Sequence, residues 1–246
     1  MARRRFLVQE IRNGAAELRG EDARHLAKVL RAEPGQQYEI SDGTHLCLAE
    51  VAGVERDRVL FRVLADLETP ELPLNLALYV ALIKFDRFEW MVEKATELGV
   101  SFIVPVDAAR SGKGLLEAAR NRVERWRRIA HESSQQSRRL RPPEIGEPRT
   151  LSAALPETCH LGYFLDEEPG CPPLASALPA PSERHPSDSA ALLIGPEGGW
   201  TEAERATALA AGWRAVSLGP LILRAETAAI TATALLVHGW WTCQLE

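Results

Sequence analysis

The chain has 246 residues, of which 46% are hydrophobic and 26% are charged, and its formal net charge is −5. This length fits one large domain or two modest ones, and the composition excludes a globally disordered chain. No apolar run approaches the roughly 20 residues that a membrane helix needs, and the N-terminus lacks the apolar core of a secretion signal. We therefore expect a cytoplasmic protein without a membrane segment.

The cysteines do not suggest a metal site. They lie at Cys47, Cys159, Cys171 and Cys243. No two of them form a C-x-x-C pair and no two histidines have zinc-finger spacing, so we expect no bound metal. Ordinary thiols in a reducing compartment are the simpler interpretation.

The first seventy residues predict short strands joined by turns. Strand patterns cover residues 35–43, 47–54 and 59–67, and a short helix is expected at residues 21–31. The first of these strands ends at an Asp-Gly turn, which is typical of hairpins. Several short strands with such turns predict a small β-barrel in residues 1–72.

Beyond residue 72 the pattern changes to strands that alternate with helices. Strands are expected at 74–83, 102–106, 161–165, 191–194 and 216–218, and helices at 85–98, 115–134, 201–211 and 226–241. This alternation predicts a mostly parallel α/β sheet in residues 73–246. Six prolines between Asp166 and Asp188 predict that this stretch is an extended surface loop or is partly disordered.

Basic residues are concentrated in one segment. From Arg110 to Arg149 there are eleven basic and five acidic residues, which gives this segment a charge of +6. Ten of the eleven are arginines, whose planar guanidinium group binds phosphate and stacks on bases. The segment is therefore either a phosphate-binding track or a solvated helix face.

The segment from Leu192 to Glu204 has the clearest functional pattern. Its sequence, L-L-I-G-P-E-G-G-W-T-E-A-E, takes a buried strand into a glycine-rich turn. Thr201 and Glu204 then predict a capping box at the start of a helix. In open α/β sheets ligands bind at the ends of such strands, although a tight structural turn is the alternative. The fingerprints of dinucleotide-binding and P-loop sites are absent.

A second segment, from Leu218 to Ala229, repeats this arrangement. Its sequence, L-G-P-L-I-L-R-A-E-T-A-A, places Arg224 and Glu226 in an otherwise apolar context. Such charged residues are usually paired or functional when they are buried. The alternative is an exposed first helical turn in which Glu226 complements the helix dipole.

The two segments together resemble the SPOUT superfamily of methyltransferases, and more narrowly the RsmE type, which makes N3-methyluridine in 16S ribosomal RNA. The resemblance continues along the chain. V-L-R with P-G-Q at residues 29–36 is similar to the family's N-terminal RNA-binding domain. E-K-A-T-E-L-G-V at 93–100 and Q-S-x-R-x-R-x-P-x-I at 136–145 match further family motifs.

The resemblance implies a fold and partners. It implies a PUA-like RNA-binding β-barrel in residues 1–72 and a SPOUT domain with a deep trefoil knot in residues 73–246. It also implies a homodimer, with Trp240 and Trp241 as candidate contacts unless they are core residues. The expected substrate is the 16S ribosomal RNA of the small ribosomal subunit.

The resemblance also implies the site residues. S-adenosylmethionine is the expected cofactor, and the residues expected to bind it are Leu193, Ile194, Gly195, Gly198, Gly199, Leu218, Gly219, Leu223 and Thr227. Arg224 is expected to stabilise charge on the uracil oxygens, with Glu226 orienting it and Glu197 as a weaker candidate for the proton acceptor. The expected RNA contacts are Arg31, Arg122, Arg125, Arg138, Arg139 and Arg141.

Some positions depart from the family pattern and leave alternatives open. Gln135, Arg138, Leu221 and Ala109 differ from the residues that are usual there. These departures affect the expected contacts with RNA more than the expected transfer of the methyl group. One alternative is a SPOUT methyltransferase that modifies another RNA base or a ribose. The other is an RNA-binding protein that has lost methyl transfer.

Overall fold

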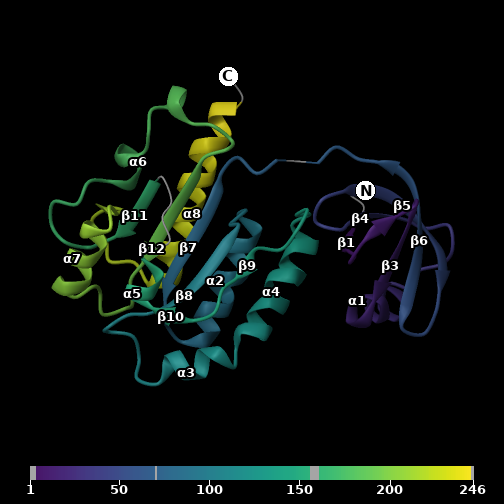
Figure 1. Ribbon diagram of the computed structural model, residues 1–246, viewed down its shortest axis with the longest axis horizontal. Helices are drawn as coiled ribbons and strands as arrows, with labels where there is room; N and C mark the ends of the chain where they lie inside the picture. The colour runs from purple at the N-terminus through teal and green to yellow at the C-terminus, as the bar shows by residue number, and fades with distance from the viewer. Residues whose placement is uncertain (1–3, 70, 156–160, 245–246) are drawn as a thin grey trace. The chain divides into compact units, whose positions relative to one another are not determined.

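The computed structural model describes residues 4–69, 71–155 and 161–244, so the predicted thiol Cys159 lies outside the described residues. The chain divides into two compact units (Figure 1). The smaller unit contains the chain up to Glu71 together with His131–Pro142, and the larger unit contains Leu72–Ala130 and the chain from Pro143 onward. The domain boundary predicted at residue 72 placed residues 131–142 in the second domain, whereas in the structure they belong to the smaller unit.

The smaller unit is built on a curled sheet. Its strand order is β1 (Arg5–Leu7), β4 (Gln37–Ser41), β5 (Leu46–Val54), β6 (Arg58–Asp66), β3 (Ala15–Arg19) and β2 (Ile11–Arg12). β1 is parallel to β4, whereas the other neighbours are antiparallel. Register shifts between β5 and β6 bend the sheet around a core that includes Leu26, Ile40 and Phe61. The predicted strands of this small β-domain are confirmed.

Two helical segments accompany this sheet. α1 (Gly20–Arg24) continues into a π-helical turn (His25–Val29), where the predicted short helix lies. The distant segment His131–Pro142 is attached to the same unit. The Ser41 hydroxyl donates to the Leu140 carbonyl at 2.7 Å, and the buried Arg5 guanidinium donates to the Arg138 carbonyl.

The larger unit contains a parallel sheet. Its strand order is β10 (Arg149–Thr150), β8 (Phe102–Asp107), β7 (Asn75–Ala81), β12 (Ser189–Ile194), β11 (Leu161–Leu165) and β13 (Arg214–Val216), with β9 (Glu144–Ile145) paired to β8. All of these neighbouring pairs are parallel. The predicted α/β class is therefore confirmed.

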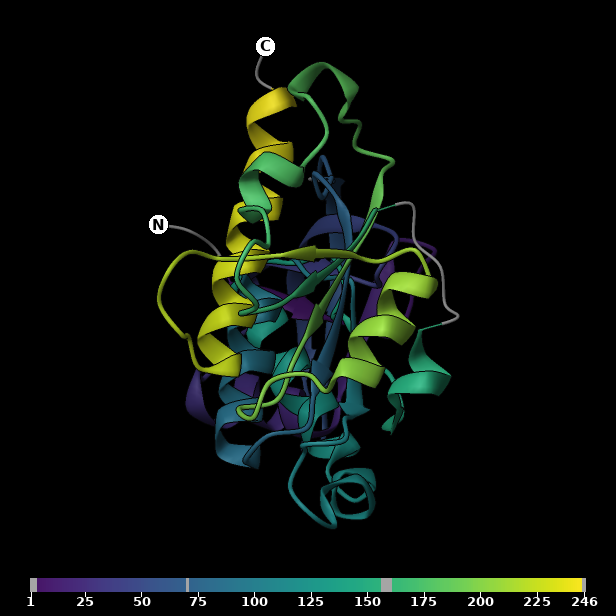
Figure 2. The same cartoon turned by 90° about the vertical axis from the view of Figure 1, so that its left-hand side faces the viewer.

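Helices cover both faces of this sheet. α2 (Phe85–Glu97), α4 (Val123–Gln136) and α8 (Ala225–Trp241) share a core with alternate residues of β7, such as Leu78. α5 (Leu151–Ala154) and α7 (Glu202–Ala210) share the core on the other face, to which the next β7 residue, Tyr79, belongs. Figure 2 shows α8 in yellow and α7 in yellow-green on opposite sides of the sheet.

The single helix expected at residues 115–134 was wrong, because the chain breaks it in two. α3 (Leu115–Arg120) ends at Asn121, and α4 starts at Val123. The Arg122 N–H donates to the Ala119 carbonyl at 2.8 Å, an i to i−3 bond that closes the first helix tightly. Asparagine is a poor residue for a helix interior and a common one near a helix end.

The proline-rich stretch after Asp166 is also more structured than expected. It contains α6 (Leu174–Ala177) and a 3₁₀ turn (Pro181–Glu183). Leu174 is buried in the main core, and its N–H donates to the Ser217 carbonyl at 2.8 Å. The Arg184 guanidinium donates to the Gly239 carbonyl of α8 at 2.7 Å. The stretch is therefore packed onto the domain by apolar and hydrogen-bonding contacts that proline content alone did not reveal.

The two C-terminal tryptophans differ in their surroundings. Trp240 is a core residue, and its indole N–H donates to Asp188 at 2.9 Å. Trp241 is half exposed.

Within the described residues, no helix is long and apolar enough to cross a membrane. The passage of the chain through its own loops, which defines the expected knot, stays a prediction.

Candidate active site

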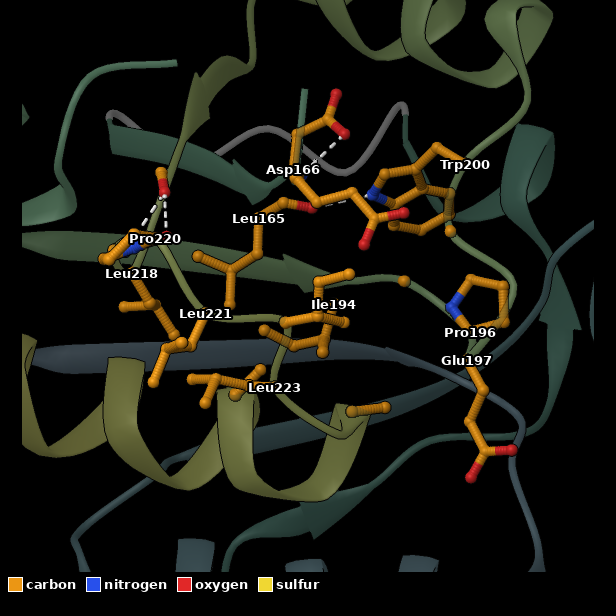
Figure 3. Close-up of a pocket in the computed structure, with 18 residues that line it drawn as sticks. Leu165, Asp166, Ile194, Pro196, Glu197, Trp200, Leu218, Pro220, Leu221 and Leu223 are labelled. Carbon is orange, nitrogen blue, oxygen red and sulfur yellow. Dashed lines mark hydrogen bonds between the residues drawn. The ribbon is translucent and has the colours of Figure 1, made fainter. Parts of the chain in front are cut away.

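Three neighbouring strands end at one pocket. β11, β12 and β13 are parallel, so their carboxyl ends meet at the same edge of the sheet. The pocket is lined by residues 165–167, by most of 194–200 and by 217–223, which end these strands or directly follow them, and by Ala225 and Ala228 of α8 (Figure 3). This is the edge at which open α/β sheets bind ligands.

Most of the predicted cofactor residues lie here, but not all. The pocket is lined by Ile194, Gly195, Gly199, Leu218, Gly219 and Leu223, and also by Glu197. Leu193 instead faces the core on the α7 side of the sheet. Thr227 is exposed on α8, and Gly198 contacts Arg110. Arg224 and Glu226 are not among the lining residues.

Trp200 packs against the glycine-rich loop that follows β12. Its side chain is 2% exposed, and its indole N–H donates to the Leu165 carbonyl at 2.9 Å. A Cβ atom at Gly195 would lie 3.0 Å from the Trp200 ring, which is closer than ordinary carbon contacts. Gly199 has a φ of +68°, a left-handed conformation that favours glycine. These two glycines are therefore required by the loop itself.

Two further contacts hold this loop in place. The Arg110 guanidinium donates to the Gly198 carbonyl at 2.7 Å. The capping box is confirmed, because the Glu204 N–H donates to the Thr201 hydroxyl at 3.3 Å and the Thr201 N–H donates to the Glu204 carboxylate at 2.8 Å. The second Glu204 oxygen accepts the Ala109 N–H at 2.7 Å. The helix start is thereby tied to the loop after β8.

The second loop supplies an apolar wall. Figure 3 shows Leu218, Leu221 and Leu223 on one side of the pocket and Pro196 with Glu197 at the other end. Leu221 and the neighbouring Ile222 are 78% and 84% exposed. An apolar wall facing a glycine-rich backbone suits a flat heteroaromatic ring, because exposed N–H and C=O groups can bond its edge.

Sequence reasoning missed the acidic residues after β11. The Asp166 carboxylate is almost fully buried and accepts two hydrogen bonds from the Arg205 guanidinium, at 2.7 and 3.1 Å. Glu167 is exposed and lines the pocket beside Gly199. The signal was available, since both residues directly follow a strand in the parallel sheet.

Arg87 of α2 joins the two glutamates that were expected in catalysis. Its guanidinium pairs with Glu197, and its Nε lies 3.8 Å from Oε1 of Glu226. Glu226 had been expected to orient Arg224. Among the described residues, however, no ion pair joins those two, and Arg224 is exposed at the N-cap of α8. No local pattern pointed to Arg87, because 110 positions separate it from Glu197.

The arginines expected to contact RNA fall in different surroundings. In the larger unit, Arg122 and Arg125 are exposed but pair with Glu89. In the smaller unit, Arg31 and Arg141 are exposed and Arg138 is half exposed. Arg139 also belongs to that unit.

Arg139 is a structural residue in this arrangement. It is buried, and its guanidinium donates to the Arg141 carbonyl at 3.2 Å. Burial lowers the pKa of Arg139 to about 10, with a further contribution from the charge of Arg141. A buried guanidinium is poorly placed to bind a phosphate.

In the part of the chain that the structure describes, no group of three His, Cys, Asp or Glu side chains could hold a metal ion.

Comparisons with known proteins agree with this geometry. The model of the RNA methyltransferase domain matches residues 70–237, and that of the RNA methyltransferase PUA domain matches residues 18–64. The ribosomal RNA small subunit methyltransferase E of Bacillus subtilis is 33% identical, over 89% of this chain and 88% of its own. The chain belongs to the ribosomal RNA small subunit methyltransferase E family.

Other known proteins are similar over comparable lengths. The enzyme of the same name from Synechocystis is 35% identical over 85% of this chain and 68% of its own. The structure of the family member from Neisseria gonorrhoeae bound to S-adenosyl methionine has a TM-score of 0.83 and 31% identity, covering 96% of this chain and 97% of that one. A Legionella pneumophila methyltransferase with bound SAM has a TM-score of 0.81 and 30% identity, with the same coverage. These similarities confirm the resemblance on which the SPOUT fold was expected.

Proposed function

We propose that this protein transfers a methyl group from S-adenosylmethionine to N3 of a specific uridine in the 16S ribosomal RNA of the small ribosomal subunit. The observation that carries the proposal is the pocket at the ends of β11, β12 and β13, in a member of the ribosomal RNA small subunit methyltransferase E family. Two similar proteins whose structures contain bound S-adenosylmethionine have this fold.

The pocket fits the cofactor. The adenine would lie against Leu218 and Leu223, with backbone groups around Gly219 bonding its edge. The glycine loop from Gly195 lines the pocket with its backbone, and its shape depends on the absence of a side chain at Gly195, which would meet Trp200. When bound, the cofactor supplies an electrophilic methyl group on a sulfonium. The protein must position the acceptor and remove one proton.

The acceptor nitrogen sets the requirements for the protein. Uridine N3 carries a proton and normally faces its pairing partner, so the base must be unpaired or flipped out. Loss of that proton leaves negative charge on the flanking carbonyl oxygens. In this proposal the exposed Arg224 stabilises the charge, and Glu197 or Glu226 accepts the proton.

The smaller unit is assigned to RNA binding. The PUA domain model matches its central residues, and Arg31 and Arg141 are exposed in this unit, with Arg138 half exposed. Arg122 and Arg125 remain candidates on the larger unit, whereas Arg139 supports the fold. We also propose a homodimer formed through α8, because Leu235 and Trp241 expose large apolar side chains on this helix.

A methyl-transfer assay tests the proposal. The protein would be incubated with labelled S-adenosylmethionine and small ribosomal subunits that lack the modification, in parallel with Arg224→Ala. We expect N3-methyluridine in the digested RNA, with loss in the variant. A different methylated nucleoside would indicate another RNA target. Cofactor binding without any product on subunits or free ribosomal RNA would reject the target, and absence of cofactor binding would indicate an RNA-binding protein without methyl transfer.

A further inference from the structure

Glu226 is a buried acid with an unused acceptor. Its side chain is 6% exposed, and within the described residues its Oε2 atom has no hydrogen-bond partner. A buried polar atom that lacks a partner is costly, and such atoms persist at sites where a ligand completes the bonding. The first turn of α8 that carries Glu226 also supplies Ala225 to the pocket wall.

We propose that Glu226 accepts the N3 proton of the substrate uridine, and that Arg87 is the positioning residue that holds its carboxylate for this step. The inference rests on the proposed function. Arg87 supplies the opposite charge, with its Nε 3.8 Å from the Glu226 carboxylate, and Glu197 in turn pairs with the far end of the same guanidinium. Arg87 is thus fixed between the two acids.

The surroundings of the two acids distinguish their roles. The Glu197 carboxylate is 51% exposed and already pairs with Arg87, so water solvates it. The Glu226 carboxylate is almost dry and keeps one oxygen free. Interactions between charges and partial charges are stronger in a dry site than in water. Glu226 is therefore the better acceptor, and Glu197 serves to orient Arg87.

The proposed step is balanced in atoms and charge. The N3–H bond breaks as a proton passes to Oε2 of Glu226, and the N3 electron pair forms a bond to the methyl carbon. The bond between that carbon and sulfur breaks, and its electron pair returns to sulfur. The sulfonium and the carboxylate thus become a neutral thioether and a neutral carboxylic acid, which afterwards releases its proton to water.

The same arrangement also distinguishes uracil from cytosine as the target nucleobase. The pairing edge of uracil presents a donor at N3 between two acceptor oxygens, whereas cytosine presents a bare acceptor at N3. A carboxylate accepts a hydrogen bond from the first and repels the second. The Arg87 guanidinium can donate to a flanking uracil oxygen. The same two residues would therefore reject cytidine at the target position.

Variants of Glu226, Arg87 and Glu197 test the assignment by methyl transfer to small subunits. Glu226→Gln should lower kcat by at least about 100-fold, which is the usual range for loss of a general base. Glu226→Asp, which keeps the carboxylate, should lose less. Arg87→Ala should lower kcat by at least about tenfold, with KM values within about threefold, and Arg87→Lys should recover part of the loss. Lys94→Ala, which removes a cation of the same helix that pairs with Glu93 and Glu97, is the matched control and should resemble wild type.

A binding measurement provides a readout that does not depend on turnover. Small subunits reconstituted with uridine or cytidine at the target position would be titrated in the presence of S-adenosylhomocysteine. Wild type should prefer uridine, and Glu226→Gln should lose that preference while its affinity for S-adenosylhomocysteine stays within about twofold.

The outcomes separate the two proposals. If wild type makes no N3-methyluridine, the proposed function fails and this inference fails with it. If wild type makes it but Glu226→Gln keeps more than a tenth of kcat, or Glu197→Gln loses more than Glu226→Gln, the assignment of Glu226 is overturned. If Arg87→Ala behaves like Lys94→Ala, the role of Arg87 is overturned.

Discussion

The contact between Gly195 and Trp200 allows a sharp test of the pocket. An alanine at position 195 would place its Cβ 3.0 Å from Cε2 and 3.1 Å from Nε1 of Trp200, well inside the 3.5–4.0 Å optimum for carbon contacts. The indole cannot withdraw easily, because it is 2% exposed and bonded to the Leu165 carbonyl. Forcing an extra methyl group into a packed site costs about 1–3 kcal/mol. We therefore expect Gly195→Ala to lower the free energy of unfolding by that amount.

The same strain should weaken cofactor binding. A shift of the loop at Gly195 moves the backbone that lines the pocket, so we expect the dissociation constant of S-adenosylhomocysteine to rise at least about tenfold, equivalent to about 1.4 kcal/mol. Urea unfolding and calorimetric titration measure the two effects. Gly146→Ala is the control in the same unit, because its added Cβ would meet its nearest neighbour, Phe102, at an ordinary 3.4 Å. If Gly195→Ala matches that control in both assays, the role given to Trp200 is refuted.

Three other changes test separate parts of the structure. Thr201→Ala removes the N-cap of α7 and should cost about 0.5–2 kcal/mol in urea unfolding; no loss would contradict the cap. Arg205→Ala leaves the buried Asp166 carboxylate unpaired and should cost about 3–5 kcal/mol, and adding Asp166→Asn should recover part of it. Burial alone would raise the pKa of Asp42, but hydrogen bonds, first from the His45 N–H, lower it to about 2. Its stabilisation is therefore complete above about pH 4 and is lost as pH falls toward 2. Asp42→Ala should flatten acid unfolding of the smaller unit over that range, and an unchanged profile would contradict this.

The parts of the fold that the sequence predicted are those governed by local pattern. β5 and β6 alternate in polarity, and the face of α2 that carries Phe88 and Met91 repeats at helical spacing, so each element follows from its own residues. The break at Asn121 and the packing of Leu174 depend on contacts with other elements. A local pattern contains no information about such contacts.

The same distinction applies to the residues of the site: some follow from a local pattern, and others depend on contacts between distant elements. Gly195 and Gly219 could be identified because a glycine-rich turn after a buried strand is a local feature. Glu167 follows a strand too, but its neighbour in the pocket is Gly199, which lies in a different loop. Arg87 and Arg110 act on the glycine loop from elements far away in the sequence. Only the folded arrangement brings them to the glycine loop.

The first turn of α8 takes part in both proposed tasks of the site, which are cofactor binding and removal of the proton. Ala225 and Ala228 are three positions apart, so they share one face of the helix and line the pocket with the smallest side chains available to it. Glu226 is rotated by about 100° from Ala225 and therefore lies on a neighbouring face, beside Arg87 of α2. One helical turn thus borders the proposed cofactor site and presents the acid proposed to take the proton. A shift of this turn would change both at once, so strain introduced at α8 should impair cofactor binding and turnover together, unlike Glu226→Gln, which should impair turnover and leave cofactor affinity near that of wild type.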